Sequence, residues 1–394
     1  MKKMTRVLSM ALAAMMVIGS LTACGGGDDK AATTTKDGEA VFTIGGMGPL
    51  TGAAASYGVS VKQGGEIAIA EINEAGGVKV GDTTYKLALV FEDDEATEDK
   101  AIQAYNAVMD QGAQAIMGAV TSGACIAITD LTLEDGILQI TPSGSAMDCA
   151  KNDNGFRMCF TDPAQGENMA DLAVNTLGYK KIAVLWDNAS DYSMGIKDAF
   201  EAKVKELGGT IVASESFATG DVDYNTQLTT IKGTDAEVIF VPAYYQEATY
   251  ITKQAADLGM KLPFLGSDGW DGILATVKDT ASVEGAIFLS PFFAADPSDN
   301  VKAFVAAYEA AYGATPDQFA ADAYDGIYAI KAAAEKAGLT PDMSVSDMCE
   351  AMKTAMTEIT IDGLTGEGIT WTADGEPSKA PKAMVIKDGA YTAM

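Results

Sequence analysis

Histidine is absent from this chain of 394 residues, and positive charge is scarce. Without an imidazole, the protein lacks the commonest general base, the usual nitrogen ligand of catalytic zinc, and every Ser-His or Cys-His pair. Lys and Arg total 27 against 55 Asp and Glu, and the formal net charge is -28. Because a phosphate backbone needs a basic surface, this composition excludes nucleic acid as a partner. Carboxylate or serine-lysine chemistry stays open, but the composition favours a protein that is not an enzyme.

Cysteine is also sparse, and its spacing fits no metal motif. Apart from Cys24, the chain has Cys125, Cys149, Cys159 and Cys349, without a CxxC or zinc pattern. Cys149 and Cys159 flank a polar stretch that could form a turn, so the sequence allows either a disulfide that closes this loop or buried free thiols. The glycine-rich segment 46–51 lacks the third glycine of a dinucleotide fingerprint, and no GK[ST] follows it. We expect no metal and no cofactor.

A short hydrophobic segment over residues 7–20 follows three cationic side chains at the N-terminus. It is well below the roughly 20 apolar residues that a membrane-spanning helix needs. Small residues at 21–23 precede Cys24 and three glycines, an arrangement typical of a cleaved signal peptide. The segment resembles bacterial lipoprotein signals with their lipobox. The resemblance implies a signal peptide over 1–23, lipidation of Cys24, and an extracytoplasmic location at the outer face of the cell membrane. Residues 24–40, without apolar periodicity, read as a flexible linker.

Short β-rich runs alternate with amphipathic helical runs from residue 41 onward, and the alternation begins again near residue 181. The first series predicts strands over 41–46, 86–91, 113–118 and 137–141, with helices over 56–75, over 97–111 and from 122. The second predicts strands over 181–186, 210–214 and 237–241, with helices over 192–207, 224–232 and 246–258. Such repetition needs right-handed crossovers and parallel sheets, so we predict an α/β protein with two doubly wound lobes. Late helices at 301–312 and 320–337, and late strands at 369–371 and 384–387, must return to sheets already formed.

An ordered set of short motifs extends over nearly all of the chain after residue 40. The motifs are IGGMGPLTG at 44–52, Tyr57-Gly58, AEINEAGG at 70–77, FEDD at 91–94, GILQITPS at 136–143, the segment 156–166 and GSDG at 266–269. Their order resembles that of extracytoplasmic solute-binding proteins of branched-chain amino-acid ABC transporters. Each motif is weak by itself, but the ordered set is specific.

This resemblance implies a periplasmic-binding-protein type I fold, in which two Rossmann-like lobes are joined by three hinge crossovers and close on the ligand. Mapped onto this chain, the N-terminal lobe is 41–161 plus 292–365 and the C-terminal lobe is 162–291 plus 366–394. The implied function is that of a monomeric, lipid-anchored substrate-binding protein. It would capture a branched-chain or similar small aliphatic amino acid and deliver it to the permease subunits of an ABC importer.

Two hydroxyl-rich turns, at 118–123 and 141–145, follow successive predicted strands. An α-carboxylate needs hydrogen-bond donors, and open α/β sheets place ligands at the carboxyl ends of their strands, often at a helix N-terminus. The family resemblance assigns the carboxylate to the Ser122 side chain, the backbone of Ser143 and Gly144, and the Ser145 hydroxyl.

The α-ammonium of an amino acid needs a carboxylate, and Asp268 in the GSDGW segment is the candidate. Many family members carry glutamate at this position. The resemblance also implies aromatic walls for the pocket, from Tyr57, Tyr192, Tyr244 and Trp270. Tyr245 replaces Tyr244 if the alignment slips by one residue.

Several other functions stay open on the sequence alone. The same fold could bind an aromatic amino acid, an amide or a purine. The chain could also be an extracellular sensor ectodomain, which genomic neighbours would separate from a transport protein. A hydrolase built on carboxylates is a third class, and turnover of amides or glycosides would support it.

Overall fold

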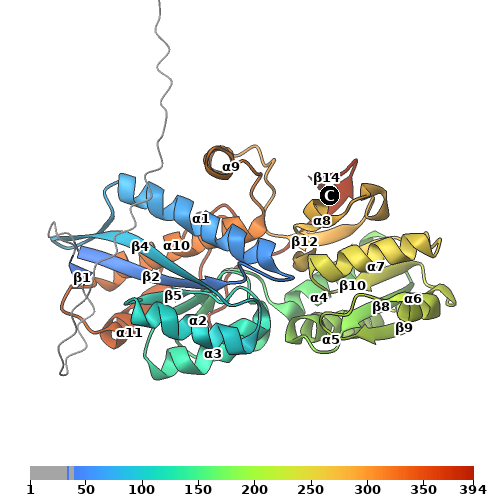
Figure 1. The fold of residues 1–394 in the computed structure, drawn as a ribbon, viewed down its shortest axis with the longest axis horizontal. Coiled ribbons are helices and arrows are strands. Elements are labelled where there is room, and N and C mark those ends of the chain that lie inside the picture. Colours follow the sequence, from blue (N-terminus) through green and yellow to red (C-terminus); the bar gives the residue numbers. More distant parts are fainter. Residues whose placement is uncertain (1–32, 35–39) are drawn as a thin grey trace, which may run out of the picture.

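The computed structural model describes residues 33–34 and 40–394, which form two lobes, each built on one seven-stranded sheet (Figure 1). In the first sheet the order is β3-β4-β2-β5-β6-β7, with β1 beside β2. β1 and β3 pair antiparallel with their neighbours, and the others pair parallel. The strands are β1 (Thr33–Thr34), β2 (Ala40–Gly48), β3 (Val78–Val80), β4 (Thr83–Asp93), β5 (Ala115–Met117), β6 (Gln139–Thr141) and β7 (Gly155–Arg157).

Helices cover both faces of the first sheet. Figure 1 shows α1 above it and α2 and α3 below it, and α1 packs along α10 from much later in the chain. Every residue of β5, β6 and β7 is buried, as expected for parallel strands covered on both faces. The helices are α1 (Ala55–Glu74), α2 (Glu98–Asp110), α3 (Ser122–Glu134), the 3-10 turn η1 (Met147–Ala150), α9 (Asp299–Tyr312), α10 (Gln318–Ala337) and α11 (Val345–Met356).

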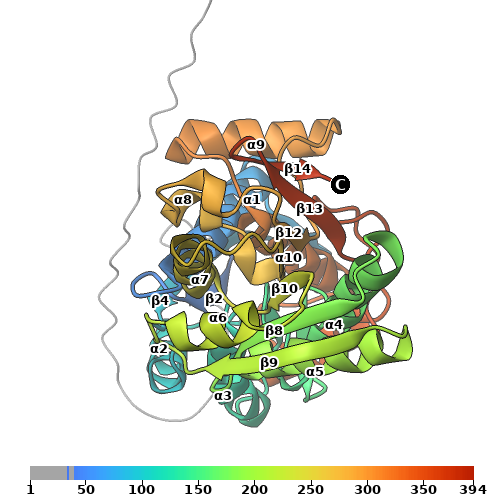
Figure 2. The same cartoon turned by 90° about the vertical axis from the view of Figure 1, so that its right-hand side faces the viewer.

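The second sheet has the order β14-β13-β12-β11-β10-β8-β9, with β9 at one edge and β14 at the other (Figure 2). β8 to β12 are parallel, and β13 and β14 are added antiparallel. Its strands are β8 (Lys181–Asp187), β9 (Thr210–Phe217), β10 (Val238–Val241), β11 (Phe264–Gly266), β12 (Ile287–Ser290), β13 (Lys382–Lys387) and β14 (Ala390–Ala393). Its helical segments are α4 (Asp162–Asp171), the π-helical η2 (Leu172–Thr176), α5 (Asp191–Glu206), α6 (Asn225–Lys232), α7 (Tyr245–Asp257), η3 (Asp268–Trp270), α8 (Ile273–Thr276) and η4 (Thr280–Ser282).

The predicted fold class, two doubly wound α/β lobes joined by three crossovers, is confirmed. The chain leaves the first sheet after β7, leaves the second after β12, and returns to the second at β13. Among the described residues, no helix is both long enough and apolar enough to cross a membrane. Cys24 and most of the predicted linker lie outside the described residues, and Thr33–Thr34 within that linker pair with β2.

The segment 366–379 differs from its prediction in two ways. The expected strand at 369–371 is wrong, because Ile369 and Trp371 form only isolated bridges. The hydrogen bonds of the segment also run to the first lobe, since Arg157 N donates to Gly375 O and Trp371 Nε1 donates to Arg157 O. We therefore propose that the third crossover lies between residues 379 and 382, later than the boundary at 365/366 that the sequence indicated.

The cysteines after residue 40 are buried free thiols. Cys125, Cys149, Cys159 and Cys349 are all unpaired, so of the two alternatives for Cys149 and Cys159 the structure has the thiols and not the disulfide. Cys149 Sγ instead lies 3.6 Å from the carbonyl oxygen of Ser122, beneath the turns described next.

Candidate functional site

Two turns at the carboxyl ends of β5 and β6 lie side by side and are joined by hydrogen bonds. Ser143 Oγ donates to Val120 O (2.7 Å), and Ser122 Oγ accepts from Ala146 N (3.2 Å). All four residues are buried. Ser122 and Ser143 therefore lie close together in the structure. Their hydroxyls form the hydrogen bonds that connect the two turns.

Gly144 and Ser145 complete the second turn. Gly144 N donates to Thr141 Oγ1 (2.8 Å), and a Cβ at residue 144 would lie 2.7 Å from that same oxygen, so a larger residue does not fit. Ser145 Oγ is buried and has no hydrogen-bond partner within the described residues. The Ser145 hydroxyl, one of the predicted carboxylate contacts, is thus not used by the turn itself.

Arg157 supports the second turn from behind, and the sequence analysis did not single it out. Its side chain is 0% exposed, and Nη1 donates to Gly144 O and Ala146 O, both at 3.0 Å. Nη2 donates to Met147 O at 3.0 Å, and Nε lies 3.1 Å from a carboxylate oxygen of Glu376. One guanidinium therefore fixes three carbonyls of the turn and places a positive charge behind it. A lone arginine at the end of an otherwise apolar strand is the signal that could have revealed it.

Asp268 lies across from these turns, on the second lobe, where β11 leads into η3. Tyr192 Oη donates to Asp268 Oδ1 (2.5 Å) and accepts from Gly269 N (3.0 Å). Gln165 Oε1 accepts from Asp268 N (3.0 Å), which holds the backbone in place. Burial raises the pKa of the Asp268 carboxyl to about 6, and the hydrogen bond from Tyr192 opposes this shift. The structure thus brings the predicted pair Tyr192 and Asp268 into direct contact.

Tyr57, from α1 of the first lobe, reaches into the second lobe. Its hydroxyl donates to Gly269 O and accepts from Tyr245 N (3.1 Å). Gln318, at the start of α10 in the first lobe, adds a second link, since its Nε2 donates to Asp268 O (2.6 Å). These contacts join the lobes at the predicted site.

The structure separates the roles of Tyr244, Tyr245 and Trp270. Tyr244 lies at the cavity between the lobes and contacts the Tyr192 ring, with ring centroids 4.9 Å apart. Tyr245 binds Tyr57 through its backbone and packs on that ring at 5.0 Å, but is not part of the cavity wall. Trp270, predicted as a wall residue, does not line this cavity; its side chain is fully buried, and its indole N–H donates to Val241 O (2.9 Å).

A small cavity at the centre of the site has a volume of about 10 Å³. It is lined from both lobes by Tyr57, Val120, Thr121, Ser143, Tyr192, Tyr244, Asp268, Gly269 and Phe319. Phe319, whose ring centroid lies 4.2 Å from that of Tyr57, is a wall residue that the sequence did not reveal. A phenylalanine at the start of a helix carries no signal that separates a ligand contact from core packing.

Asp162, the first residue of α4, is a second buried carboxyl group near Asp268 that the sequence analysis missed. It is 1% exposed, and neither of its oxygens has a hydrogen-bond partner within the described residues. The hydroxyl of Ser145 lies beside it without the geometry of a good hydrogen bond. Burial raises the pKa of Asp162 well above its usual value, and the Ser145 hydroxyl opposes the shift. The segment 161–166 was part of the family resemblance, but its acidic residue was given no role.

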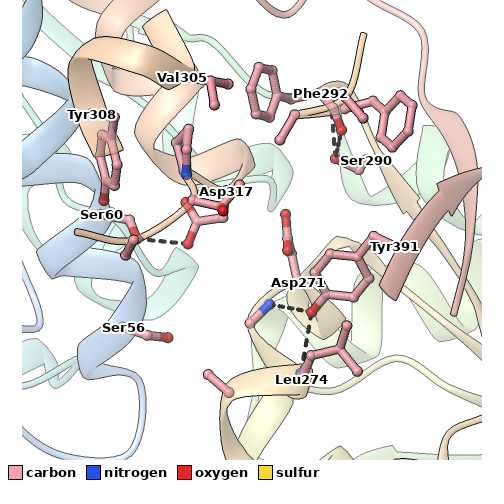
Figure 3. Close-up of a pocket in the computed structure, with 18 of the residues that line it drawn as sticks. Ser56, Ser60, Asp271, Leu274, Ser290, Phe292, Val305, Tyr308, Asp317 and Tyr391 are labelled. Atoms are coloured by element: carbon pink, nitrogen blue, oxygen red, sulfur yellow. Dashed lines mark hydrogen bonds between the residues drawn. The ribbon is translucent and has the colours of Figure 1, made fainter. Parts of the chain in front are cut away.

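A larger side cavity of about 750 Å³ lies between the lobes beside the second crossover (Figure 3). Figure 3 shows Asp317 and Ser60 on its first-lobe wall, where Ser60 Oγ donates to Asp317 Oδ2 (2.7 Å), and Asp271 on the opposite wall. Asp271 Oδ2 accepts from Gln318 N (3.1 Å), which is another link between the lobes. Burial raises the pKa of both carboxyls, and for Asp271 the nearby Asp317 charge adds to the effect.

These raised pKa values predict that the protein loses stability as the pH rises. Burial also raises the pKa of Asp94 and of Glu247 to about 7. The native state therefore keeps protons that the unfolded chain has lost above its ordinary carboxyl pKa of about 4, so stability falls as the pH rises from about 4 through the folded-state pKa values of about 6 to 8 and levels off above them. Each unit of pKa difference corresponds to about 1.4 kcal/mol.

We expect a lower Tm at pH 8.5 than at pH 5.5, measured by calorimetry in about 0.5 M salt to screen the net charge. An Asp271→Asn variant should show a shallower decline. An equal Tm at both pH values would contradict the raised pKa values of these buried carboxyls.

Comparison with known proteins agrees with this architecture. The model of the periplasmic binding protein family matches residues 41–390, and the chain belongs to that family. A Leu/Ile/Val-binding protein homolog of Brucella melitensis is 33% identical over 304 residues, which cover 76% of this chain and 80% of that protein. The branched-chain amino-acid substrate-binding protein LivJ of Streptococcus pneumoniae, solved with isoleucine, is 31% identical with a TM-score of 0.81, over 90% of this chain and 98% of that one. A leucine-binding protein LivK of Thermotoga maritima is 28% identical with a TM-score of 0.80, at the same coverage.

Proposed function

We propose that this protein captures a branched-chain amino acid outside the cytoplasmic membrane and delivers it to the permease of an ABC importer. The observation that carries the proposal is the composition of the site. Hydroxyl and backbone groups of the first lobe face the Asp268 carboxyl of the second, and the tyrosines and Phe319 form the walls between them. A ligand with a carboxylate, an ammonium and an apolar side chain matches these three parts. The names of the relatives above, which bind leucine, isoleucine and valine, agree with it.

Closure of the lobes is the proposed mechanism of capture. The carboxylate turns belong to the first lobe, whereas Tyr192 and Asp268 belong to the second, so a ligand touches both sets only when the lobes close. A ligand that makes more contacts in the closed form shifts the equilibrium toward it. A permease can then distinguish loaded from empty protein by shape. We propose that the protein acts as a monomer, since each chain carries the complete site.

The direct test is a thermal-shift screen of the twenty amino acids, with amides and nucleobases as competitors, followed by calorimetry. A ligand at 100 times its Kd should stabilise the protein by about 2.7 kcal/mol. We expect leucine, isoleucine and valine to raise the Tm most, and solution scattering to show a smaller radius of gyration with ligand than without. Stabilisation by aromatic amino acids, amides or purines alone would replace the proposed ligand class. Tight binding with no change in scattering would contradict the closure mechanism.

The lipid anchor at Cys24 is a separate part of the proposal, and it lies outside the described residues. A Cys24→Ala variant should fractionate as a soluble protein, because a diacylglyceryl group supplies two chains and a single chain holds only marginally. Membrane fractionation with mass spectrometry of the N-terminus measures the effect, and Cys349→Ala is the matched control. If the Cys24→Ala protein stays on the membrane and no lipid is found on the wild type, the anchor is wrong.

A further inference from the structure

Asp162 is tied to the carboxylate turn by its backbone, and its side chain packs against α5. Asp162 N donates to Ser145 O (2.9 Å), which ties the first residue of α4 to the carboxylate turn. A Cβ at residue 195 would lie 2.9 Å from Asp162 Oδ2, so the side chain is turned toward α5, one turn after Tyr192. Tyr192 is the residue that hydrogen-bonds to Asp268.

Charged and titratable groups surround Asp162 from several elements. Those that act on it electrostatically are Asp268, Arg157 and Asp191, and the Asp162 charge in turn acts on Tyr244. Arg157 is already committed to three backbone carbonyls and to Glu376. A positive group that directly contacts Asp162 is therefore absent from the described residues, although the carboxyl is almost completely buried.

A helix-capping role does not account for this carboxyl. An acidic residue in the first turn of a helix is usually solvated and stabilises the helix dipole. Here the cap of α4 is the preceding residue, since Thr161 Oγ1 accepts from Ala164 N (3.2 Å), and Asp162 is withdrawn from solvent. Burial of an ionisable group without a partner is costly, so its retention points to a partner that arrives from outside.

We propose that Asp162 is a second carboxylate for the α-ammonium of the ligand, and that the Asp162–Asp268 pair makes the site select amino acids over the corresponding carboxylic acids. The inference rests on the proposed function. An ammonium has three N–H donors, and Asp268 Oδ1 already accepts from Tyr192, so a single carboxylate leaves donors unsatisfied. A carboxylic acid without the ammonium supplies no positive group to either carboxyl, so it binds without the contact that Asp162 and Asp268 provide.

The proposed contact predicts a specific pattern of affinities for leucine and for 4-methylpentanoate, which is leucine without its ammonium. Asp162→Asn should bind leucine roughly 10- to 100-fold more weakly than the wild type, the range expected for a lost charge-assisted hydrogen bond in a buried site. Its affinity for 4-methylpentanoate should stay equal or rise. The matched control is Asp171→Asn, at the exposed end of the same helix, which should behave as the wild type for both ligands.

Proton release supplies a second readout that a merely structural role would not move. The ammonium favours the ionised form of Asp162, so binding at pH 6 should release a proton fraction that calorimetry in two buffers of different ionisation enthalpy detects. Asp162→Asn should release less than the wild type. If this variant unfolds, Asp162→Ser is measured in the same way.

The outcomes separate this inference from the proposed function. A wild-type protein that binds no branched-chain amino acid contradicts the proposed function itself. A wild-type protein that binds leucine, together with an Asp162→Asn protein of unchanged leucine affinity, contradicts only the role of Asp162. If Asp162→Asn weakens the binding of leucine and of 4-methylpentanoate equally, Asp162 only maintains the shape of the site, and the inference is also overturned.

Discussion

Replacing Asp268 by alanine is expected to weaken the binding of a branched-chain amino acid by about 2–5 kcal/mol, because the ligand ammonium is then buried without its principal partner. Asp268 is the best-placed carboxyl for this task, since Tyr192 orients it and Gln165 fixes its backbone. Titration calorimetry on purified protein measures the loss. The effect should depend on pH, because the raised pKa of Asp268 means that affinity falls as the pH drops through about 6.

The control for this experiment is Asp257→Ala, which removes an exposed carboxylate of the same lobe that pairs only with Lys253. Exposed ion pairs contribute little, so affinity should be unchanged. A loss below tenfold in Asp268→Ala, with a normal unfolding transition, would remove Asp268 from the ammonium site.

Replacing Arg157 by methionine should lower the free energy of unfolding by about 3–5 kcal/mol, the cost of breaking a buried ion pair by removing one partner. Methionine fills part of the space but leaves three carbonyls without donors and Glu376 without its cation. The turn that carries Ser145 then loses its support, so ligand affinity should fall as well. Chemical denaturation and calorimetry measure the two effects.

Lys353→Met is the matched control, because Lys353 forms ion pairs with Asp153 and Glu350 at the surface, whereas the ion pair of Arg157 is buried. We expect that change to cost less than about 1 kcal/mol. Equal destabilisation by the two substitutions would show that the burial of Arg157 does not matter.

The fold was predictable because its signals are local. Alternating β-rich and amphipathic runs predicted α1, α5 and α7 to within one or two residues of their ends. The strand predicted at 384–387 lies within β13. The segment 366–379 was not predictable, because no local pattern shows on which lobe it rests. Trp371 was predicted to lie in a strand, but it is buried against the first lobe, where its indole N–H donates to Arg157 O.

The candidate site was predictable where function places polar residues in unusual positions. Serines after buried strands and an acid beside a glycine gave Ser143 and Asp268, which line one cavity in the structure. Trp270 could not be assigned, because a ligand wall and a core need the same side chain. Asp162 was missed for another reason, since a carboxyl at the start of a helix is ordinary until its burial is known.

The return of the chain to each lobe has a consequence for how the protein is made. α1 packs on α10, which follows the entire second lobe, and the second sheet needs β13 and β14 from the last residues of the chain. Neither lobe can be completed until synthesis has almost ended. Contacts of such long sequence separation make folding slow. The chain therefore stays incompletely folded for longer after synthesis, and a truncation before β13 would leave both the edge of β12 and the third crossover unmade.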